Sequence, residues 1–272
     1  MAIFGTIGWF VKNIDLGRSE IALYRALLAC VLLGGYFLAS KKNPFKNIRR
    51  ALPLLLLSGA AMGFNWILLF EAYRYTTVST ATLCYYFAPV LVMILCPVLF
   101  KERLTGKQIL CFVISTASLV LITVSGRASS GSDSLRGILL GLGAAVLYAF
   151  VVILNKFITD VDGIRRTFLQ FIAAAVTLLP YVALTGGFHF TSLDNVGLIC
   201  MLVVGLVHTG ATYCMYFSSL ATLPGQEVAI LSYIDPLVAV LVSVLLLSEP
   251  MSALQYAGGA CLLGATLWNE LS

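Results

Sequence analysis

Apolar stretches follow one another along the whole of this chain, and short polar segments separate them. Each stretch but the first has about the 20 residues that an α-helix needs to cross a bilayer. The ten predicted helices, numbered below as spans 1 to 10, cover residues 2–13, 19–39, 51–72, 77–99, 107–125, 135–157, 164–185, 194–219, 224–247 and 252–270. The pattern therefore predicts an all-α membrane protein with ten transmembrane helices.

The composition supports this prediction and excludes several other classes of protein. Of the 272 residues, 60% are hydrophobic and only 11% are charged, whereas soluble domains carry about 25% charged residues. The net charge of +5 resides in short turns between spans and gives no nucleic-acid signal. The seven cysteines lie in apolar stretches without C-x-x-C spacing, which is typical of small buried side chains. We expect no metal, no cofactor and no nucleic-acid partner.

The first stretch is too short to cross a membrane as one helix. Either the sequence begins inside this span or the span is broken, and we expect one or two further helical turns before Met1. The stretch lacks the basic segment and the small-residue cleavage site of a signal peptide.

Lysine and arginine favour one orientation. If the loop after span 2 is cytoplasmic, the cytoplasmic loops hold Lys41, Lys42, Lys46, Arg49, Arg50, Lys101, Arg103, Lys107, Lys156, Arg165 and Arg166, and the outer loops hold Lys12, Arg18, Arg74, Arg127 and Arg136. Because cytoplasmic loops carry the excess of basic residues, we expect both termini in the cytoplasm.

One part of the sequence occurs twice. Residues 70–108 align without a gap with residues 217–255, so that Phe70, Tyr86, Pro89, Leu99, Glu102 and Gln108 fall on Phe217, Tyr233, Pro236, Leu246, Glu249 and Gln255. Five spans per half is an odd number, so the second half must cross the membrane in the opposite direction. We predict two inverted five-helix repeats, residues 1–126 and 135–272, joined by a polar Gly/Ser linker at 127–134.

The charges of the repeated turn agree with the inversion. The turn with Glu102 holds Lys101, Arg103 and Lys107, whereas uncharged residues stand at these positions in the turn with Glu249. The repetition of the two glutamates indicates a shared structural task, either capping the next helix or gating through hydrogen bonds.

Asp235, near the middle of span 9, is the strongest candidate for chemistry. An ionised carboxylate at mid-membrane costs about 2.5–3.5 kcal/mol on insertion scales, and the repeat places Ala88 at the equivalent position. Asp235 would couple transport to a proton or cation, or bind an ammonium group of the substrate. The alternative is a neutral aspartate that bonds a carbonyl freed by Pro236.

Arg25 lies about two turns into span 2, where a guanidinium needs water or a partner. It would anchor a carboxylate of the substrate. The alternative is a structural arginine that snorkels or pairs with Glu20 or Glu71.

Two further titratable residues are candidates for coupling. His208 in span 8 can change its charge near neutral pH, with a satisfied helix-packing role as the alternative. Glu227 opens span 9, where it either carries a proton or stabilises the positive end of the helix dipole.

Amide and aromatic residues in spans 3, 4, 8 and 9 complete the predicted binding site. Together with Arg25 and Asp235 they are Asn65, Trp66, Tyr85, Tyr86, Tyr213 and Tyr233. A cavity of rings and a few amides suits small amphipathic solutes, and ordinary helix packing is the alternative.

Two prolines occupy matching positions of the two halves. Pro89 and Pro236 break the hydrogen-bond ladder inside spans 4 and 9, so we predict hinges there. Glycines four residues apart, at Gly59 and Gly63 and at Gly137 and Gly141, indicate close helix contacts.

The chain resembles the drug/metabolite transporter superfamily, and in particular its EamA-like members. The resemblance rests on the opening FGTIGWFVKN, on Arg25, and on the paired stretches YYFAPVLVMILCPVLFKERLTGKQ and SYIDPLVAVLVSVLLLSEPMSALQ. It implies ten spans in two halves and alternating-access transport of small metabolites, often amino acids or drugs, commonly as exporters of the bacterial plasma membrane. Lys101 and Ser248 stand where the family usually has a glycine before the glutamate.

We therefore expect a secondary transporter, not an enzyme, which exports small organic solutes across the plasma membrane. The sequence contains no G-x-x-x-x-G-K-[ST] motif for ATP. Its partners would be the solute and the bilayer, and the sequence leaves open coupling to protons and assembly as a homodimer. The rival functions are an intramembrane lipid-modifying enzyme and a channel, although neither a catalytic constellation nor a filter sequence is recognisable.

Overall fold

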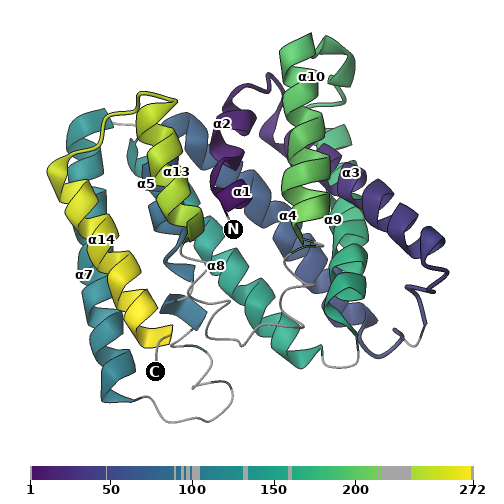
Figure 1. Cartoon of the computed structure of the whole chain (residues 1–272), viewed down its shortest axis with the longest axis horizontal. Coiled ribbons are helices and arrows are strands. Elements are labelled where there is room, and N and C mark those ends of the chain that lie inside the picture. The colour runs from purple at the N-terminus through teal and green to yellow at the C-terminus, as the bar shows by residue number, and fades with distance from the viewer. Residues whose placement is uncertain are drawn as a thin grey trace. The chain divides into compact units, whose positions relative to one another are not determined.

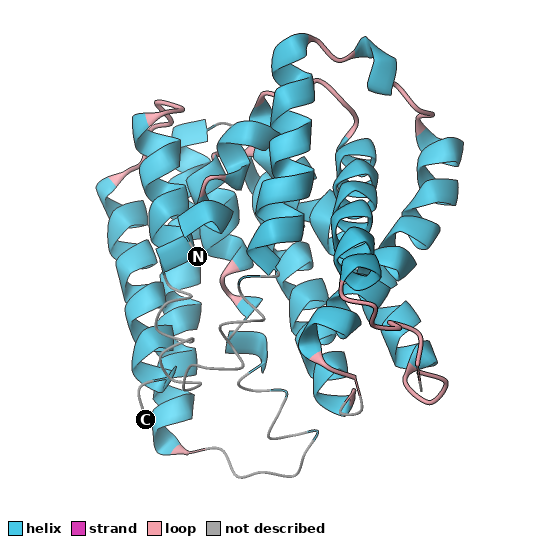
Figure 2. Cartoon of the chain, turned by 45° about the vertical axis from the view of Figure 1, so that its right-hand side comes forward, coloured by secondary structure: helices cyan, strands magenta, loops and turns pink. Residues whose placement is uncertain are grey.

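The computed structural model describes residues 2–46, 48–88, 90–92, 95, 99, 105–130, 134–158, 161–213, 215 and 234–270. Within these ranges every regular element is a helix (Figure 2). The first half holds α1 (Ala2–Gly5), α2 (Ile7–Lys12), α3 (Arg18–Ala39), α4 (Leu52–Tyr75), α5 (Val78–Tyr85) and α7 (Gly106–Ser130) (Figure 1). The second half holds α8 (Ser134–Phe157), α9 (Gly163–Thr185), the short 3₁₀ helix η1 (Phe190–Ser192), α10 (Asn195–Leu202), the π-helix η2 (Val203–Ala211), α13 (Ile234–Leu245) and α14 (Ala253–Glu270).

The helices confirm the predicted fold class, an all-α membrane protein with ten transmembrane helices in two inverted repeats. Every predicted span contains a helix in its described part. Within the described ranges, four helices are long and apolar enough to cross a membrane, namely α3, α4, α8 and α9, and shorter apolar helices lie in other spans. Span 1 is divided at Thr6, whose N–H and hydroxyl both donate to the carbonyl of Ile3.

Polar side chains set where several helices begin. Thr77, Asp162 and Asp194 each stand before a helix and accept the backbone N–H of the residue three positions later. Such N-caps satisfy amide groups that the first helical turn leaves without partners. The short polar segments between the apolar stretches therefore start α5, α9 and α10.

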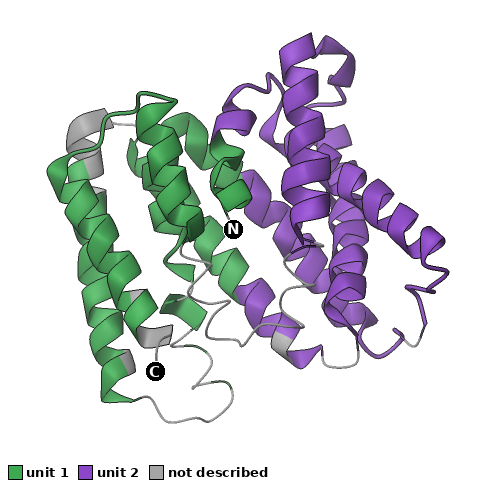
Figure 3. Ribbon diagram, viewed as in Figure 1, with its two compact units in different colours: residues 1–8, 68–149, 223–272 green, residues 9–67, 150–222 purple. Residues whose placement is uncertain are grey.

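The helices group into two compact units (Figure 3). Unit 1 comprises Met1–Gly8, Leu68–Ala149 and Leu223–Ser272, and unit 2 comprises Trp9–Ile67 and Phe150–Thr222. Each unit therefore contains helices from both halves of the sequence.

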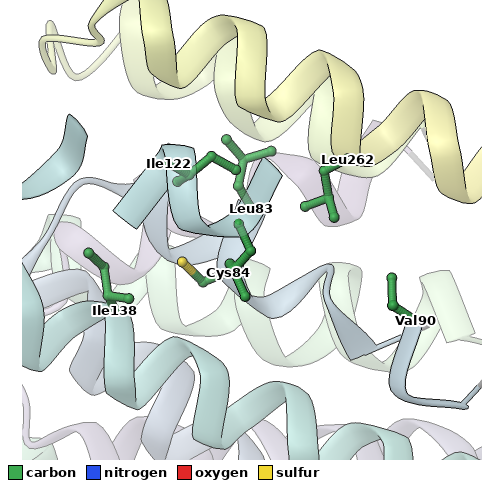
Figure 4. Packing of buried hydrophobic residues seen from close by; sticks show 7 residues of the cluster. Leu83, Cys84, Val90, Ile122, Ile138 and Leu262 are labelled. Carbon is green, nitrogen blue, oxygen red and sulfur yellow. The ribbon is translucent and has the colours of Figure 1, made fainter. Parts of the chain in front are cut away.

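Unit 1 is built around α5, α7, α13 and α14. α7 packs along α14, its counterpart in the repeat, while α13 packs on both α1 and α5. A buried apolar cluster joins α5, α7, α8 and α14 and consists of Leu83, Cys84, Val90, Leu119, Ile122, Ile138 and Leu262 (Figure 4).

Unit 2 is built around α3, which packs on α9, its counterpart in the repeat, and on η2. Its apolar cluster consists of Ala51, Leu55, Ile158, Val161 and Leu169. The predicted close contact at Gly59 and Gly63 is confirmed: a Cβ on Gly59 would lie 2.5 Å from the carbonyl oxygen of Gln170, and one on Gly63 would lie 3.0 Å from Leu178. Small residues thus bring α4 directly onto the backbone of α9.

Candidate functional sites in the two units

Unit 1 holds a group of three tyrosines and one carboxylate, the aspartate cluster (Tyr85, Tyr86, Tyr148 and Asp235). The hydroxyl of Tyr86, at the end of α5, donates a hydrogen bond to Oδ2 of Asp235 in the first turn of α13. The ring of Tyr85 lies 6.0 Å from that of Tyr86 and 5.3 Å from that of Tyr148. Because Tyr86 and Asp235 come from opposite halves, the packing of α5 on α13 assembles this cluster.

Helix α1 passes directly over the backbone of the aspartate cluster. A Cβ on Gly5 would lie 2.4 Å from the carbonyl oxygen of Asp235 and 2.7 Å from the Cβ of Val238. Only glycine allows such an approach without displacing a backbone atom. Span 1 therefore covers one side of Asp235.

Unit 2 holds the arginine cluster (Arg25, Trp66, His208 and Thr209). The side chain of Arg25 is buried, with 4% of its surface exposed, and therefore does not reach the surface as a snorkelling arginine would. Its Nε donates to the hydroxyl of Thr209 at 3.0 Å, and its guanidinium carbon lies 4.2 Å from the centre of the Trp66 ring. A guanidinium over an indole face is a favourable cation–π contact.

Aromatic rings extend from the arginine cluster. Phe171 on α9 lies 5.7 Å from the ring of Trp66 and 5.3 Å from the ring of Tyr213. Asn65, next to Trp66 on α4, is buried. Four predicted binding residues thus lie in unit 2, and Arg25, Trp66 and Tyr213 are connected there through direct contacts.

The two acids predicted as alternative partners of Arg25, and the predicted base His208, have contacts of their own. Glu20 accepts the backbone N–H of His189 at 2.6 Å, and Glu71 forms an ion pair with Arg74 at 3.1 Å. The Nδ1 of His208 lies 3.3 Å from the carbonyl oxygen of Val203. This contact suits the packing alternative for His208, whose role in coupling stays a prediction.

Glu249 binds a helix of the opposite half rather than the next helix. Its carboxylate accepts the N–H of Val78, the first residue of α5, at 2.8 Å and the hydroxyl proton of Ser243. Ser79 lies 2.9 Å from the Ser243 hydroxyl and extends the chain of hydrogen bonds. Of the two predicted tasks, capping of the next helix does not match these contacts, because the packing of α5 on α13 brings the first turn of α5 closer. Gating through hydrogen bonds stays a prediction.

The helix after Glu249 begins with its own cap. The hydroxyl of Ser252 accepts the N–H of Gln255 at 3.2 Å, and Oε1 of Gln255 accepts the N–H of Ser252 at 2.9 Å. This is a capping box. Nε2 of Gln255 also donates to Thr80 at 3.0 Å, so both repeated residues, Glu249 and Gln255, bind the first turn of α5.

We predict that Glu249→Ala lowers the free energy of unfolding by about 1–3 kcal/mol, because it leaves a buried amide and a hydroxyl without their acceptor. Glu249→Gln retains one acceptor oxygen and should cost about half as much. Unfolding of the purified protein in mixed micelles, followed by circular dichroism, measures both. Equal stability of the alanine variant and the wild type would contradict the capping role.

Several predicted residues lie outside the described part of the chain, namely Pro89, Glu102, Glu227 and Tyr233. Pro236 is the third residue of α13 as described. The hinge at the two prolines stays a prediction.

The sequence alone does not single out Thr209, Phe171 or Ser243. Phe171 and Ser243 lie in apolar stretches without any distinguishing pattern. Thr209 had a weak signal, since it follows His208 and precedes a glycine in GLVHTG. Among the described residues no group of three His, Cys, Asp or Glu side chains is placed to hold a metal ion.

The fold and its buried ionisable residues define a polytopic membrane protein of the two-repeat class. The chain belongs to the EamA-like transporter family, whose sequence profile matches residues 1–124 and 135–269. It is therefore a membrane transporter with a multi-pass chain.

Relatives and a solved structure agree with this assignment. The chain is 31% identical to an uncharacterized transporter of Bacillus subtilis named YxxF. The 242 aligned residues cover 88% of this chain and 77% of that protein. It is 27% identical to an uncharacterized transporter of Archaeoglobus fulgidus, over 98% of this chain and 93% of that protein. A crystal structure with 14% identity matches 99% of this chain and 93% of its own with a TM-score of 0.70, which shows the shared fold.

Proposed function

We propose that the protein is a secondary transporter that exports small organic metabolites, such as amino acids or drug-like solutes, across the plasma membrane by alternating access. The observation that supports this most directly is that each unit holds an ionisable side chain of a span in direct contact with an aromatic residue. Arg25 lies against Trp66, and Asp235 bonds to Tyr86. Intramembrane charges are costly and mark the path of substrates or coupling ions.

In this proposal Arg25 anchors a carboxylate of the solute, because a guanidinium offers paired donors that match carboxylate geometry. Asp235 takes up a proton or meets a cationic group, and Tyr86 orients the carboxylate by its hydrogen bond. Asn65, Trp66, Tyr85, Tyr213 and Tyr233 provide the remaining surface of the site. The protein carries out no chemical conversion of the solute.

The proposal includes the organisation inferred from the sequence. Residues 1–126 and 135–272 form the two repeats, Pro89 and Pro236 are hinges, and both termini face the cytoplasm. The support is the repeated sequence and the distribution of lysine and arginine.

Solute counterflow in proteoliposomes tests the function. Amino acids, nucleosides and organic cations are first screened for thermal stabilisation of the purified protein, since a ligand stabilises the folded state by mass action. A stabilising solute should then show saturable exchange against its unlabelled form. A channel would show non-saturable flux, an enzyme would convert the solute, and either result would reject the proposal.

We predict that Asp235→Asn abolishes the stimulation of transport by a pH gradient and retains counterflow. Asparagine keeps the shape and the acceptor for Tyr86 but cannot exchange a proton. Tyr86→Phe is the matched variant, which removes the hydroxyl and keeps the carboxylate, so it should slow both modes by about tenfold or less. Proteoliposomes with and without an imposed gradient give both rates. Undiminished stimulation in Asp235→Asn would remove Asp235 from coupling.

A further inference from the structure

The π-helix η2 differs from its counterpart in the first half by the spacing of two glycines. In η2 the glycines that contact α3 are Gly205 and Gly210, five residues apart. A Cβ on Gly205 would lie 2.4 Å from Leu28 and one on Gly210 would lie 2.5 Å from Leu32. The repeat offset places Gly210 on Gly63, which is preceded by a glycine only four residues earlier in the regular helix α4. Span 8 therefore contains one additional residue between two packing glycines, and η2 accommodates it.

Side chains within and next to η2 follow its wider turn. The hydroxyls of Thr209 and Thr212 donate to the carbonyl oxygens of Val204 and Val207, each five residues earlier and each at 2.7 Å. Threonines in an α-helix bond three or four residues back. The two threonines are thus a matched pair with the same local hydrogen bond.

Only one of this pair receives a hydrogen bond from Arg25. Because the single proton of the Thr209 hydroxyl is committed to Val204, the oxygen presents a lone pair to Nε of Arg25. The close approach at Gly205 brings α3 near enough for this contact, since Arg25 lies three residues before Leu28 on α3. Neither partner belongs to the shared fold: Met62 occupies the repeat position of Thr209, and neither Phe171 nor Ile172, the two positions that can correspond to Arg25, is an arginine.

We propose that Thr209 is the positioning residue through which η2 sets the carrier's recognition of carboxylates. Trp66 holds one face of the guanidinium and Thr209 holds its Nε edge. Together the two contacts fix the plane of the group and its rotation in that plane. This gives the guanidinium a single orientation, in which it would meet a carboxylate of the solute. This inference rests on the proposed function of Arg25. It adds that Thr209 makes the arginine selective for carboxylates.

Benzoate and benzamide are suitable probes, because they share an aromatic body and differ in the carboxylate. Their dissociation constants are measured by titration calorimetry on the full chain in nanodiscs. The wild type should bind benzoate at least about tenfold more tightly than benzamide. Thr209→Val should lower the affinity for benzoate about tenfold and leave that for benzamide unchanged, Thr209→Ser should restore selectivity, and Thr212→Val should resemble the wild type.

Each other outcome is decisive. If Thr209→Val keeps the selectivity that Arg25→Gln loses, the positioning role is wrong and the role of Arg25 stands. If the wild type binds the two probes equally, the carboxylate role of Arg25 fails first. A loss of affinity for both probes in Thr209→Val would indicate a structural role only. Thr209→Ala, which also lacks the hydroxyl, replaces the valine variant if that variant does not fold, and the same outcomes apply.

Discussion

Arg25→Gln is expected to weaken the binding of a transported carboxylate by about 100-fold and to stop its counterflow at micromolar concentrations. Removing one partner of a buried, hydrogen-bonded charge pair costs about 2–5 kcal/mol, and 2.7 kcal/mol corresponds to about 100-fold. Glutamine still donates a hydrogen bond to Thr209, so the packing of α3 on η2 should persist. Calorimetry and counterflow of the solute found in the thermal screen measure the effect.

Arg25→Lys separates charge from geometry in this experiment. Lysine keeps the positive charge but lacks the planar fork and the broad face that lies on Trp66. We expect it to restore only part of the affinity, to within about tenfold of the wild type. Size-exclusion chromatography and thermal unfolding confirm that the variants fold. Wild-type counterflow in Arg25→Gln would mean that the buried arginine has a structural task alone.

Gly59→Ala should lower the free energy of unfolding by about 3 kcal/mol, the upper end of the range for overpacked cores. The new Cβ would lie 2.5 Å from a backbone carbonyl oxygen, at Gln170, and 2.6 Å from the Cβ of Ala173. A backbone atom cannot rotate away, so α4 and α9 must separate. Titration of the micelle-bound protein with a denaturing detergent, followed by circular dichroism, gives the change.

Gly35→Ala is the matched control in the same unit. In the described part of the chain, no atom beyond its own stretch of helix lies within 4 Å of the position that its Cβ would occupy. Alanine favours a helix over glycine by about 1 kcal/mol, so this variant should be as stable as the wild type or slightly more stable. A similar loss of stability in both variants would show that close approach at Gly59 is not the cause.

The sequence predicts the helices and their repeat well, because both depend on properties that are local in the chain. A stretch of apolar residues must become a helix in a bilayer, and the offset that pairs Glu102 with Glu249 also relates α7 to α14 and α3 to α9. Four site residues can be recognised from the sequence alone. Arg25 and Asp235 stand out because a charge inside a span costs free energy, and Trp66 and Tyr86 stand out by their size. Their pairing into two clusters needs the contacts between helices.

The parts that sequence reasoning missed depend on partners from the other half. Glu249 caps α5, and nothing near Val78 in the sequence indicates a distant carboxylate. The π-helix follows from one additional residue between Gly205 and Gly210. Hydropathy does not detect this residue, because the segment is apolar whether the two glycines are four or five residues apart. In the sequence Thr209 looks like an ordinary packing residue, and only its hydrogen bond from Arg25 in the folded chain indicates a role.

The interleaving of the two halves also governs the order of events during synthesis. Arg25 and Thr209 are separated by 184 positions in the chain. At about 5–20 residues per second, the ribosome needs roughly 10–40 s to deliver the threonine after the arginine. During this interval α3 is already made, whereas η2 does not yet exist and α9 is completed only near the end. The nascent first half must therefore remain beside the insertion machinery or in contact with lipid headgroups, with its cation stabilised there, until the second half arrives.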